Sequence, residues 1–210
     1  MTREGGLSAD EGAAGAAMPL APEDVMRAEL YALLAALLRA APGAELLSGL
    51  TTLEGDESEP GRAVDALAHL AGATDPARAA REYHDLFVGV GRGELVPFGS
   101  YYLTGFLNEK PLGELRRTMR ERGMERGEGE RQPEDHIAAL MEMMAGQITG
   151  AFGAPATTRE QANFFAAHIG PWAWHFFKDL EGARSAVLYA PVGTIGRTLM
   201  EVEAQAFAME

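Results

Sequence analysis

The stretch Pro133-Glu134-Asp135-His136 opens the segment around which the rest of the chain is organised. A proline followed by two acidic residues is typical of a helix start, because proline needs no N–H there and a helix N-terminus favours negative charge. Apolar residues follow at helical spacing: Ile137, Leu140, Met141, Met144 and Ile148. The spacing predicts a core helix that starts at Pro133 and carries Asp135 and His136 on its first turn.

The spacing alone leaves the roles of Asp135 and His136 open. In one interpretation Asp135 caps the helix and His136 lies on the surface. In another, both side chains face a groove and bind a ligand. The two residues could also form an acid–base pair, but neighbours on a helix point about 100° apart and seldom pair with each other. Because no nucleophile or metal-ligand motif accompanies them, we expect that the chain is not an enzyme.

Composition favours an all-α protein. The 210 residues are rich in alanine, leucine and methionine and poor in the β-branched types. Because the chain has no cysteine, disulfides, thiol catalysis and thiolate metal sites are excluded.

The chain is strongly acidic. It has 31 acidic and 18 basic residues, which give a net charge of -13. Such a surface repels nucleic acid and anionic membranes and attracts basic partners, so we expect no nucleic-acid partner.

The chain is expected to be cytoplasmic and to have no stable membrane insertion. Its longest run without charged residues, 161–177, contains polar residues, glycine and proline. Residues 1–21 lack the continuous apolar core of a secretory signal, and we predict that they form a disordered tail. Residues 22–210 are then one all-helical domain.

Start and stop signals divide this domain into nine or ten helices and predict no strand. The predicted segments are Pro22 to about Ala41, Glu45 to Leu53, Pro60 to Ala71, a helix capped by Asp75 and ending at Phe87, one capped by Ser100, one begun by Pro111, the helix from Pro133, one begun by a capping box at Thr157, Trp172 to Gly182, and Val187 to Met209 with a kink at Pro191.

Two further patterns have ordinary interpretations. Residues 88–99 contain a GxGxG motif, but no strand precedes it and the lysine of a phosphate loop is missing, so a flexible connector is favoured over a nucleotide site. Residues 116–126 carry five arginines that alternate with glutamates. Ion pairing along a helix is favoured there over an anion site.

Three short motifs occur in a fixed order. They are aromatic-x-x-Leu-Phe-x-Gly at 83–89, Pro-aromatic-x-Ser-x-Tyr at 97–102, and Pro-x-Asp-His at 133–136. Together with 168–172 and 176–180, this ordered set resembles the TorD/DmsD family, from about Met26 to the C-terminus. Members of that family are cytoplasmic, all-helical chaperones for molybdenum-cofactor oxidoreductases exported by the twin-arginine route.

The resemblance implies both a function and a binding surface. The chain would bind the N-terminal twin-arginine leader and the folding intermediate of an oxidoreductase subunit, and assist cofactor insertion before export. It would be a monomer or a domain-swapped dimer, with no cofactor of its own apart from weak GTP binding.

Two alternative functions remain. One is an assembly scaffold of the nitrate-reductase (NarJ) type, whose client has no twin arginines. The other is a weak GTP-binding or GTP-hydrolysing protein. Matched by position, the peptide-binding residues are Tyr83, Leu86, Phe87, Pro97, Phe98, Pro133, Asp135 and His136. Tyr83 and Phe98 stand where relatives often carry tryptophan, and Gly99 is unusual at its position.

The chemistry of a leader agrees with these residues. A basic pair followed by an apolar helical stretch needs an apolar groove with acids nearby. Leu86, Phe87 and Phe98 could line the groove, although plain core packing explains Leu86 and Phe87 equally well. An exposed Met141 and Met144 would add a deformable wall. Asp135 could accept two hydrogen bonds from one arginine, a geometry that lysine does not reproduce.

Overall fold

The structure is a computed structural model that describes residues 20–127 and 132–209. Within these ranges the chain forms ten α-helices and two short π-helical turns, and it contains no strand. The prediction of an all-helical fold with nine or ten helices is therefore confirmed. The predicted disordered tail, residues 1–21, lies outside the described residues except for its last two positions.

The helices follow one another as the sequence signals suggest. The first half contains α1 (Pro22–Arg39), α2 (Ala44–Leu50), α3 (Glu59–Gly72), α4 (Pro76–Tyr83), the π-turn η1 (His84–Val88), α5 (Gly99–Thr104) and α6 (Lys110–Glu121). The second half contains α7 (Ile137–Thr149), α8 (Thr158–Phe164), the π-turn η2 (Phe165–Ile169), α9 (Ala173–Glu181) and α10 (Tyr189–Phe207). None of the helices in the described part of the chain combines the length and the apolar character needed to cross a membrane.

Local capping chemistry fixes several of these helix starts. The side chain of Asp75 accepts a hydrogen bond from the backbone N–H of Arg78 at 2.8 Å, with Pro76 at the start of α4. Thr157 and Glu160 form a complete capping box at α8. Both devices satisfy N–H groups that have no partner inside the helix, and both were predicted from the sequence.

Two predicted helix starts are wrong. The central helix α7 begins at Ile137 and not at Pro133, because residues 133–136 pair with a distant segment instead of with the helix. Helix α5 is preceded by Phe98 as its N-cap, so Ser100 lies inside it. Helix α10 starts at Tyr189, close to the expected start near Val187, and it continues without a break through Pro191. Pro191 lies in the first turn, where a backbone N–H would have no helical partner anyway.

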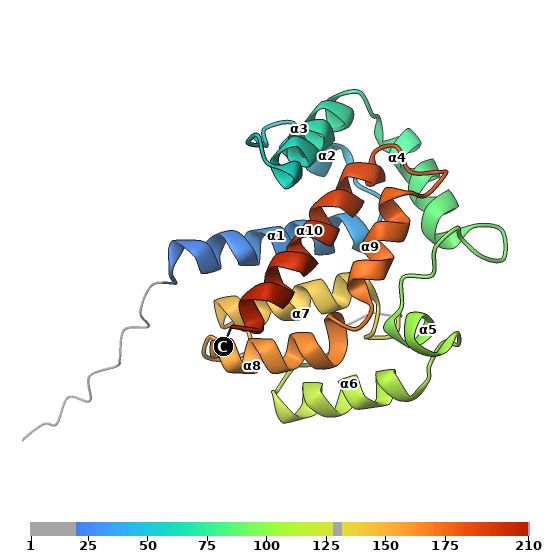
Figure 1. The fold of residues 1–210 in the computed structure, drawn as a ribbon. Coiled ribbons are helices and arrows are strands. Elements are labelled where there is room, and N and C mark those ends of the chain that lie inside the picture. Colours follow the sequence, from blue (N-terminus) through green and yellow to red (C-terminus); the bar gives the residue numbers. More distant parts are fainter. Residues whose placement is uncertain (1–19, 128–131, 210) are drawn as a thin grey trace, which may run out of the picture.

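Helices from both ends of the chain build the core. Figure 1 shows α10 crossing α1, with α9 beside α10 and α2 and α3 at one end of the molecule. Contacts of α1 with α7, and of α10 with α9 and α3, dominate the packing. The predicted stripe of α7 is buried along its whole length, at Ile137, Leu140, Met141, Met144 and Ile148. Of the apolar face predicted for α1, Val25 is 41% exposed and lies outside the core.

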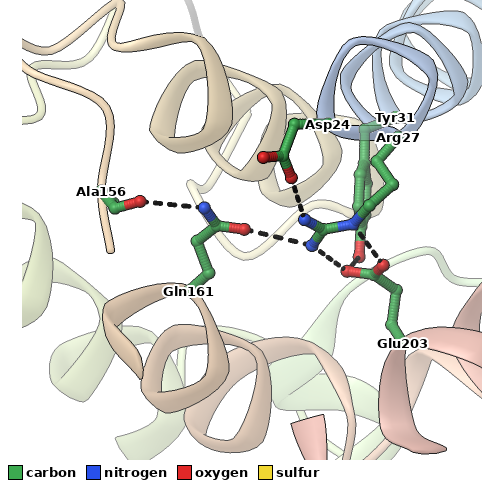
Figure 2. Close-up of polar contacts among 6 residues, drawn as sticks. All are labelled: Asp24, Arg27, Tyr31, Ala156, Gln161 and Glu203. Carbon is green, nitrogen blue, oxygen red and sulfur yellow. Dashed lines mark hydrogen bonds and ion pairs between the residues drawn. The ribbon is translucent and has the colours of Figure 1, made fainter. Parts of the chain in front are cut away.

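A part-buried ion pair joins α1 to α10, and a further hydrogen bond of the same arginine reaches α8. Arg27 of α1 donates to both carboxylate oxygens of Glu203 of α10, at 2.7 and 2.8 Å, and the hydroxyl of Tyr31 donates to the same carboxylate at 3.1 Å. Arg27 also donates to Asp24 and to the amide oxygen of Gln161 in α8 (Figure 2). Since Glu203 is only 2% exposed, these bonds replace the water that its charge has lost.

Candidate functional site

Two of the sequence motifs meet through their backbones. Phe98 and His136 face each other in an isolated antiparallel bridge. The backbone N–H of Ile137 donates to Pro97 at 2.9 Å, and that of Gly99 donates to Asp135 at 2.9 Å. The ring of Phe98 meets the imidazole of His136 edge-on at 5.0 Å between centroids. This pairing explains why residues 133–136 leave the helical path.

Asp135 is buried and holds the start of α5. Its Oδ2 accepts a hydrogen bond from the backbone N–H of Ser100 at 2.7 Å, so it caps a helix 35 residues away and not its own. The side chain is 3% exposed, and its Oδ1 has no hydrogen-bond partner among the described residues. In this conformation the carboxylate that was predicted to face a peptide lies beneath the surface.

His136 is the N-cap of α7. Its Nδ1 accepts from the backbone N–H of Ala138 at 3.1 Å, which places the proton of the neutral ring on Nε2. The residue is 3% exposed, so the interpretation of His136 as a surface residue is wrong. His136 nevertheless lines a cavity at the start of α7.

That cavity, here called the α7 pocket, has a volume of about 250 Å³. It lies between the start of α7, the end of α1 and the segment that follows α6. Its lining residues are Arg39, Met119, Glu125, Arg126, Gly127, Gln132, Pro133, Glu134, His136, Ala138, Ala139, Glu142, Met143 and Phe152. The lining combines apolar side chains with both signs of charge.

Two glutamates of the α7 pocket, Glu134 and Glu142, are paired with arginines. Arg116 donates to Glu134 at 2.7 and 2.9 Å, and Arg126 approaches the other oxygen of Glu134 at 3.8 Å. Arg39 donates to Glu142 at 2.7 Å. Burial raises the pKa of Glu134, but the hydrogen bond and charge of Arg116 outweigh it and leave the pKa below its ordinary value. The carboxyl group of Glu134 is therefore ionised at neutral pH.

The eight residues carried over from the resemblance divide into two groups. Pro133 and His136 line the α7 pocket, and Pro97, Phe98 and Asp135 support them through the paired backbones. Tyr83, Leu86 and Phe87 belong to a separate aromatic cluster. Leu86 is fully buried, and the ring of Phe87 lies 5.0 Å from Tyr83 and 5.4 Å from Tyr189.

Tyr83 links the aromatic cluster to the helix end beside the pocket. The hydroxyl of Tyr83 lies within hydrogen-bond distance of two backbone carbonyl oxygens at the end of α1, those of Leu38 at 3.2 Å and Arg39 at 3.0 Å. The side chain of Arg39 lines the α7 pocket. The cluster thus holds in place the helix end that forms one side of the pocket.

The methionines of the pocket are different ones from those expected. Met141 and Met144 are completely buried, so the expectation that they form a deformable wall is wrong. Met119 of α6 and Met143 of α7 line the pocket instead. A signal for Met143 was present in the sequence, because Ala139 and Met143 are four residues apart and off the predicted core stripe. Met119, Arg39 and Phe152 lie outside α7 and carried no such signal.

The glycine-rich loop after η1 folds back on its own backbone. The N–H groups of Gly89, Glu94 and Leu95 donate to carbonyls of residues 84–86, and Gly89 and Gly91 have positive φ angles of 61° and 87°. Within residues 20–127 and 132–209, no three histidine or acidic side chains are grouped so as to hold a metal ion.

Comparisons with known proteins identify the class. The sequence profile described as nitrate reductase delta subunit matches residues 54–178, more than half of the chain. The chain therefore belongs to the nitrate reductase delta subunit family, in agreement with the expected TorD-like resemblance.

Individual relatives agree with this membership. The chaperone protein TorD from the El Tor strain N16961 of Vibrio cholerae serotype O1 is 28% identical over 134 residues, which cover 60% of this chain and 61% of that relative. TorD from the O395 strain gives the same values. The chain thus spans about 61% of the length of the curated relatives it matches. These names describe a chaperone and not a catalysed reaction, in agreement with the expectation of a non-enzyme.

A solved structure has the same fold. The crystal structure of a protein described as a redox enzyme maturation protein, from Archaeoglobus fulgidus, superposes with a TM-score of 0.56 at 20% identity. The match covers 84% of this chain and 94% of the other. At this identity the likeness concerns the fold alone.

Proposed function

We propose that this protein is a cytoplasmic maturation chaperone that binds the N-terminal leader of a molybdenum-cofactor oxidoreductase subunit and assists cofactor insertion before export. The observation that carries the proposal is the α7 pocket, in which apolar side chains and carboxylates meet beside the family's Pro-x-Asp-His motif. A leader with an arginine pair and an apolar helical stretch has the matching chemistry. Family membership and the names of the relatives support the same class of function.

The apolar part of the leader would occupy the side formed by Met119, Met143 and Phe152. Methionine side chains are flexible and polarizable, so they adapt to different apolar partners. Phe152 is 39% exposed and offers ring surface to an incoming helix. Each large apolar side chain of the leader that becomes fully buried contributes about 1.5–3 kcal/mol.

The arginines of the leader would exchange with arginines of the protein. Glu134 and Glu142 are paired with Arg116, Arg126 and Arg39 in the free chain. A leader arginine that takes over one of these carboxylates replaces one charged hydrogen bond by another. The net gain is therefore small, and the electrostatic part of binding sets specificity more than affinity. In this proposal Asp135 and Ser100 position the wall of the pocket and do not contact the leader directly.

The test is a titration of a fluorescently labelled leader peptide into variants at low and high salt. Met143→Ala should weaken binding roughly tenfold and leave the salt dependence unchanged, because it removes apolar contact only. Glu142→Gln should flatten the salt dependence and reduce the preference for an arginine pair over a lysine pair. Glu54→Gln, which makes the same charge change in the exposed loop between α2 and α3, is the matched control.

The results of this titration distinguish between the candidate functions. Wild-type binding by both pocket variants, with circular dichroism showing them folded, would place the client elsewhere. Equal binding of leaders with and without the arginine pair would favour a second candidate, an assembly scaffold for a client without twin arginines. The description of the matching family, the nitrate reductase delta subunit, favours that candidate. No cofactor forms part of either proposal, and the weak GTP binding implied by the resemblance stays a prediction without an assigned site.

A further inference from the structure

We propose that a second cavity, at the other end of α7, binds a carboxylate group. This cavity, here called the Arg122 pocket, has a volume of about 280 Å³. It is lined by Glu121, Arg122, Met124, Gly146, Gln147, Phe152, Ala154, Pro155, Ala156 and Glu160. Only Phe152 is shared with the α7 pocket, so the inference stands independently of the proposed function.

The first observation is that the side-chain NH₂ group of Gln147 is buried and has no hydrogen-bond acceptor among the described residues. Gln147 is 4% exposed, and its Nε2 has no hydrogen-bond partner among the described residues. Its orientation is fixed, because the guanidinium of Arg122 donates to the other end of the amide and can only contact an oxygen. Two N–H bonds of a buried side chain are therefore unused at the wall of a cavity. Such groups ordinarily have partners, which points to a missing acceptor.

The second observation is the bonding of Arg122. Its guanidinium donates to two neutral oxygens, the amide oxygen of Gln147 and the backbone carbonyl of Glu160 at 2.9 Å. It also lies over the ring of Phe164, 6.0 Å from the centroid. A guanidinium carries five N–H donors, so donors remain for another acceptor. The positive charge, half-buried at the pocket, favours an acceptor that is an anion.

The two acids of the lining have partners of their own, and Glu160 also feels the charge of Arg122. The carboxylate of Glu160 accepts from the backbone N–H and the hydroxyl of Thr157 in the capping box, both at 2.8 Å. Glu121 lies 3.9 Å from Arg117 on the outer side of α6. A monoanion suits the remaining donors, whereas a phosphate dianion would meet stronger repulsion from these two acids. A carboxylate offers two acceptor oxygens, one for the guanidinium and one for Nε2 of Gln147.

In this proposal a movement of Phe152, which lines the cavity together with Gln147, opens access to the buried Nε2. The ring of Phe152 packs against Gly146, where an added Cβ would lie 2.5 Å from it. Phe152 is 39% exposed on the loop between α7 and α8, so its ring can turn outward without leaving a buried position. The carboxylate could belong to a free small molecule or to an aspartate or glutamate side chain of a bound peptide. In both cases the guanidinium of Arg122 and Nε2 of Gln147 would donate to the carboxylate.

The experiment follows the side-chain NH₂ signals of Gln147 by ¹⁵N NMR in the intact protein. The probes are acetate, N-acetyl-glutamate N-methylamide, and its neutral glutamine analogue. We expect the two carboxylates to shift the Gln147 signals and the neutral analogue to leave them nearly unchanged. A larger shift with the glutamate derivative than with acetate indicates a peptide side chain as the natural ligand. The reverse indicates a free small carboxylate.

Variants separate recognition from a general charge effect. Arg122→Gln should weaken the response to the glutamate probe about tenfold or more, because a charge-assisted bond is lost. Arg120→Gln removes the same charge from an exposed position two residues earlier and should retain the response. Gln147→Leu, read through the backbone amides of residues 146 and 147, should also weaken binding. Equal shifts with the acidic and neutral probes, or an unchanged response in a folded Arg122→Gln protein, would overturn the proposal.

Discussion

The partly buried imidazole of His168 shows how one residue responds to the packing around it. Nε2 of His168 in η2 lies 2.9 Å from the hydroxyl of Thr118 in α6, and its ring packs on Phe164. Burial lowers the pKa of His168; the nearby Glu114 opposes the shift, and Arg122 and Arg117 add to it. The folded protein therefore holds this histidine neutral over a wider pH range than the unfolded chain does.

The pH dependence of stability follows from that difference. In the unfolded chain the histidine pKa is about 6.5. Below about pH 6.5 the unfolded state binds more protons at His168 than the folded state does. The contribution of His168 to the free energy of unfolding is therefore fully present above about pH 6.5, and it is lost as the pH falls through the lower pKa of the folded protein. We expect His168→Gln to reduce the loss of unfolding free energy between neutral and mildly acidic pH. Urea denaturation at several pH values measures this. The exposed His69→Gln should behave like wild type, and the same behaviour in His168→Gln would contradict the assignment.

Helix α10 depends on a carboxylate from another helix for its start. Oε1 of Glu82, in α4, accepts from the backbone N–H groups of Val187 at 2.7 Å and Tyr189 at 2.9 Å. The carboxylate of Glu94 accepts from the backbone N–H groups of Arg184 at 2.8 Å and Ser185 at 3.1 Å. These four N–H groups precede or begin α10, where no helical acceptor exists. The loop between α9 and α10 is therefore ordered by acids from a distant part of the chain.

Removing the first of these acids should loosen the start of α10. Glu82→Ala leaves two partly or fully buried N–H groups unpaired, which we expect to cost about 1–3 kcal/mol of unfolding free energy. Hydrogen exchange at Val187 and Tyr189 should accelerate, while amides in the middle of α7 report only global unfolding. Glu54→Ala, in an exposed loop, is the control. Unchanged exchange at Val187 and Tyr189 would show that the contact is not stabilising.

At the scale of the whole molecule, the two ends of the described chain are joined by charge as well as by apolar packing. The network of Arg27, Glu203, Tyr31 and Gln161 joins α1, α8 and α10 (Figure 2). The hydrogen bond to Glu203 raises the pKa of Arg27, and burial opposes this shift. Because most of Glu203 is out of water, its charge is stabilised only while Arg27 and Tyr31 remain in place.

Removing one partner of this ion pair should therefore lower the free energy of unfolding more than removing both partners does. We expect Arg27→Met to lower the unfolding free energy by about 3–5 kcal/mol, because it leaves a buried carboxylate without its cation. The double variant Arg27→Met/Glu203→Leu should recover most of that loss, since no unpaired charge remains. Urea denaturation of the wild type, both single variants and the double variant gives the coupling. Additive effects in the double variant would contradict a buried, energetically coupled pair.

Much of the fold could be predicted because its signals are local. Capping by Asp75 and by Thr157 and Glu160 depends on residues within one turn, and the burial of α7 follows from spacing along one helix. The ordered motifs were sufficient to indicate the family. The start of α7 was mispredicted because the backbone of 133–136 is paired with residues 97–99, a contact that no local pattern encodes.

The sequence by itself determined the helical class, most helix positions and the segments that form the candidate site. Only the tertiary structure decided what each side chain does there. Asp135 has the residue type to bind an arginine, but packing turned it towards Ser100 and away from solvent. Met143 lines the α7 pocket while Met141 and Met144 are buried, because α1 packs along α7 and covers one face of it. Spacing tells which residues share a face, and burial depends on which distant helix that face meets.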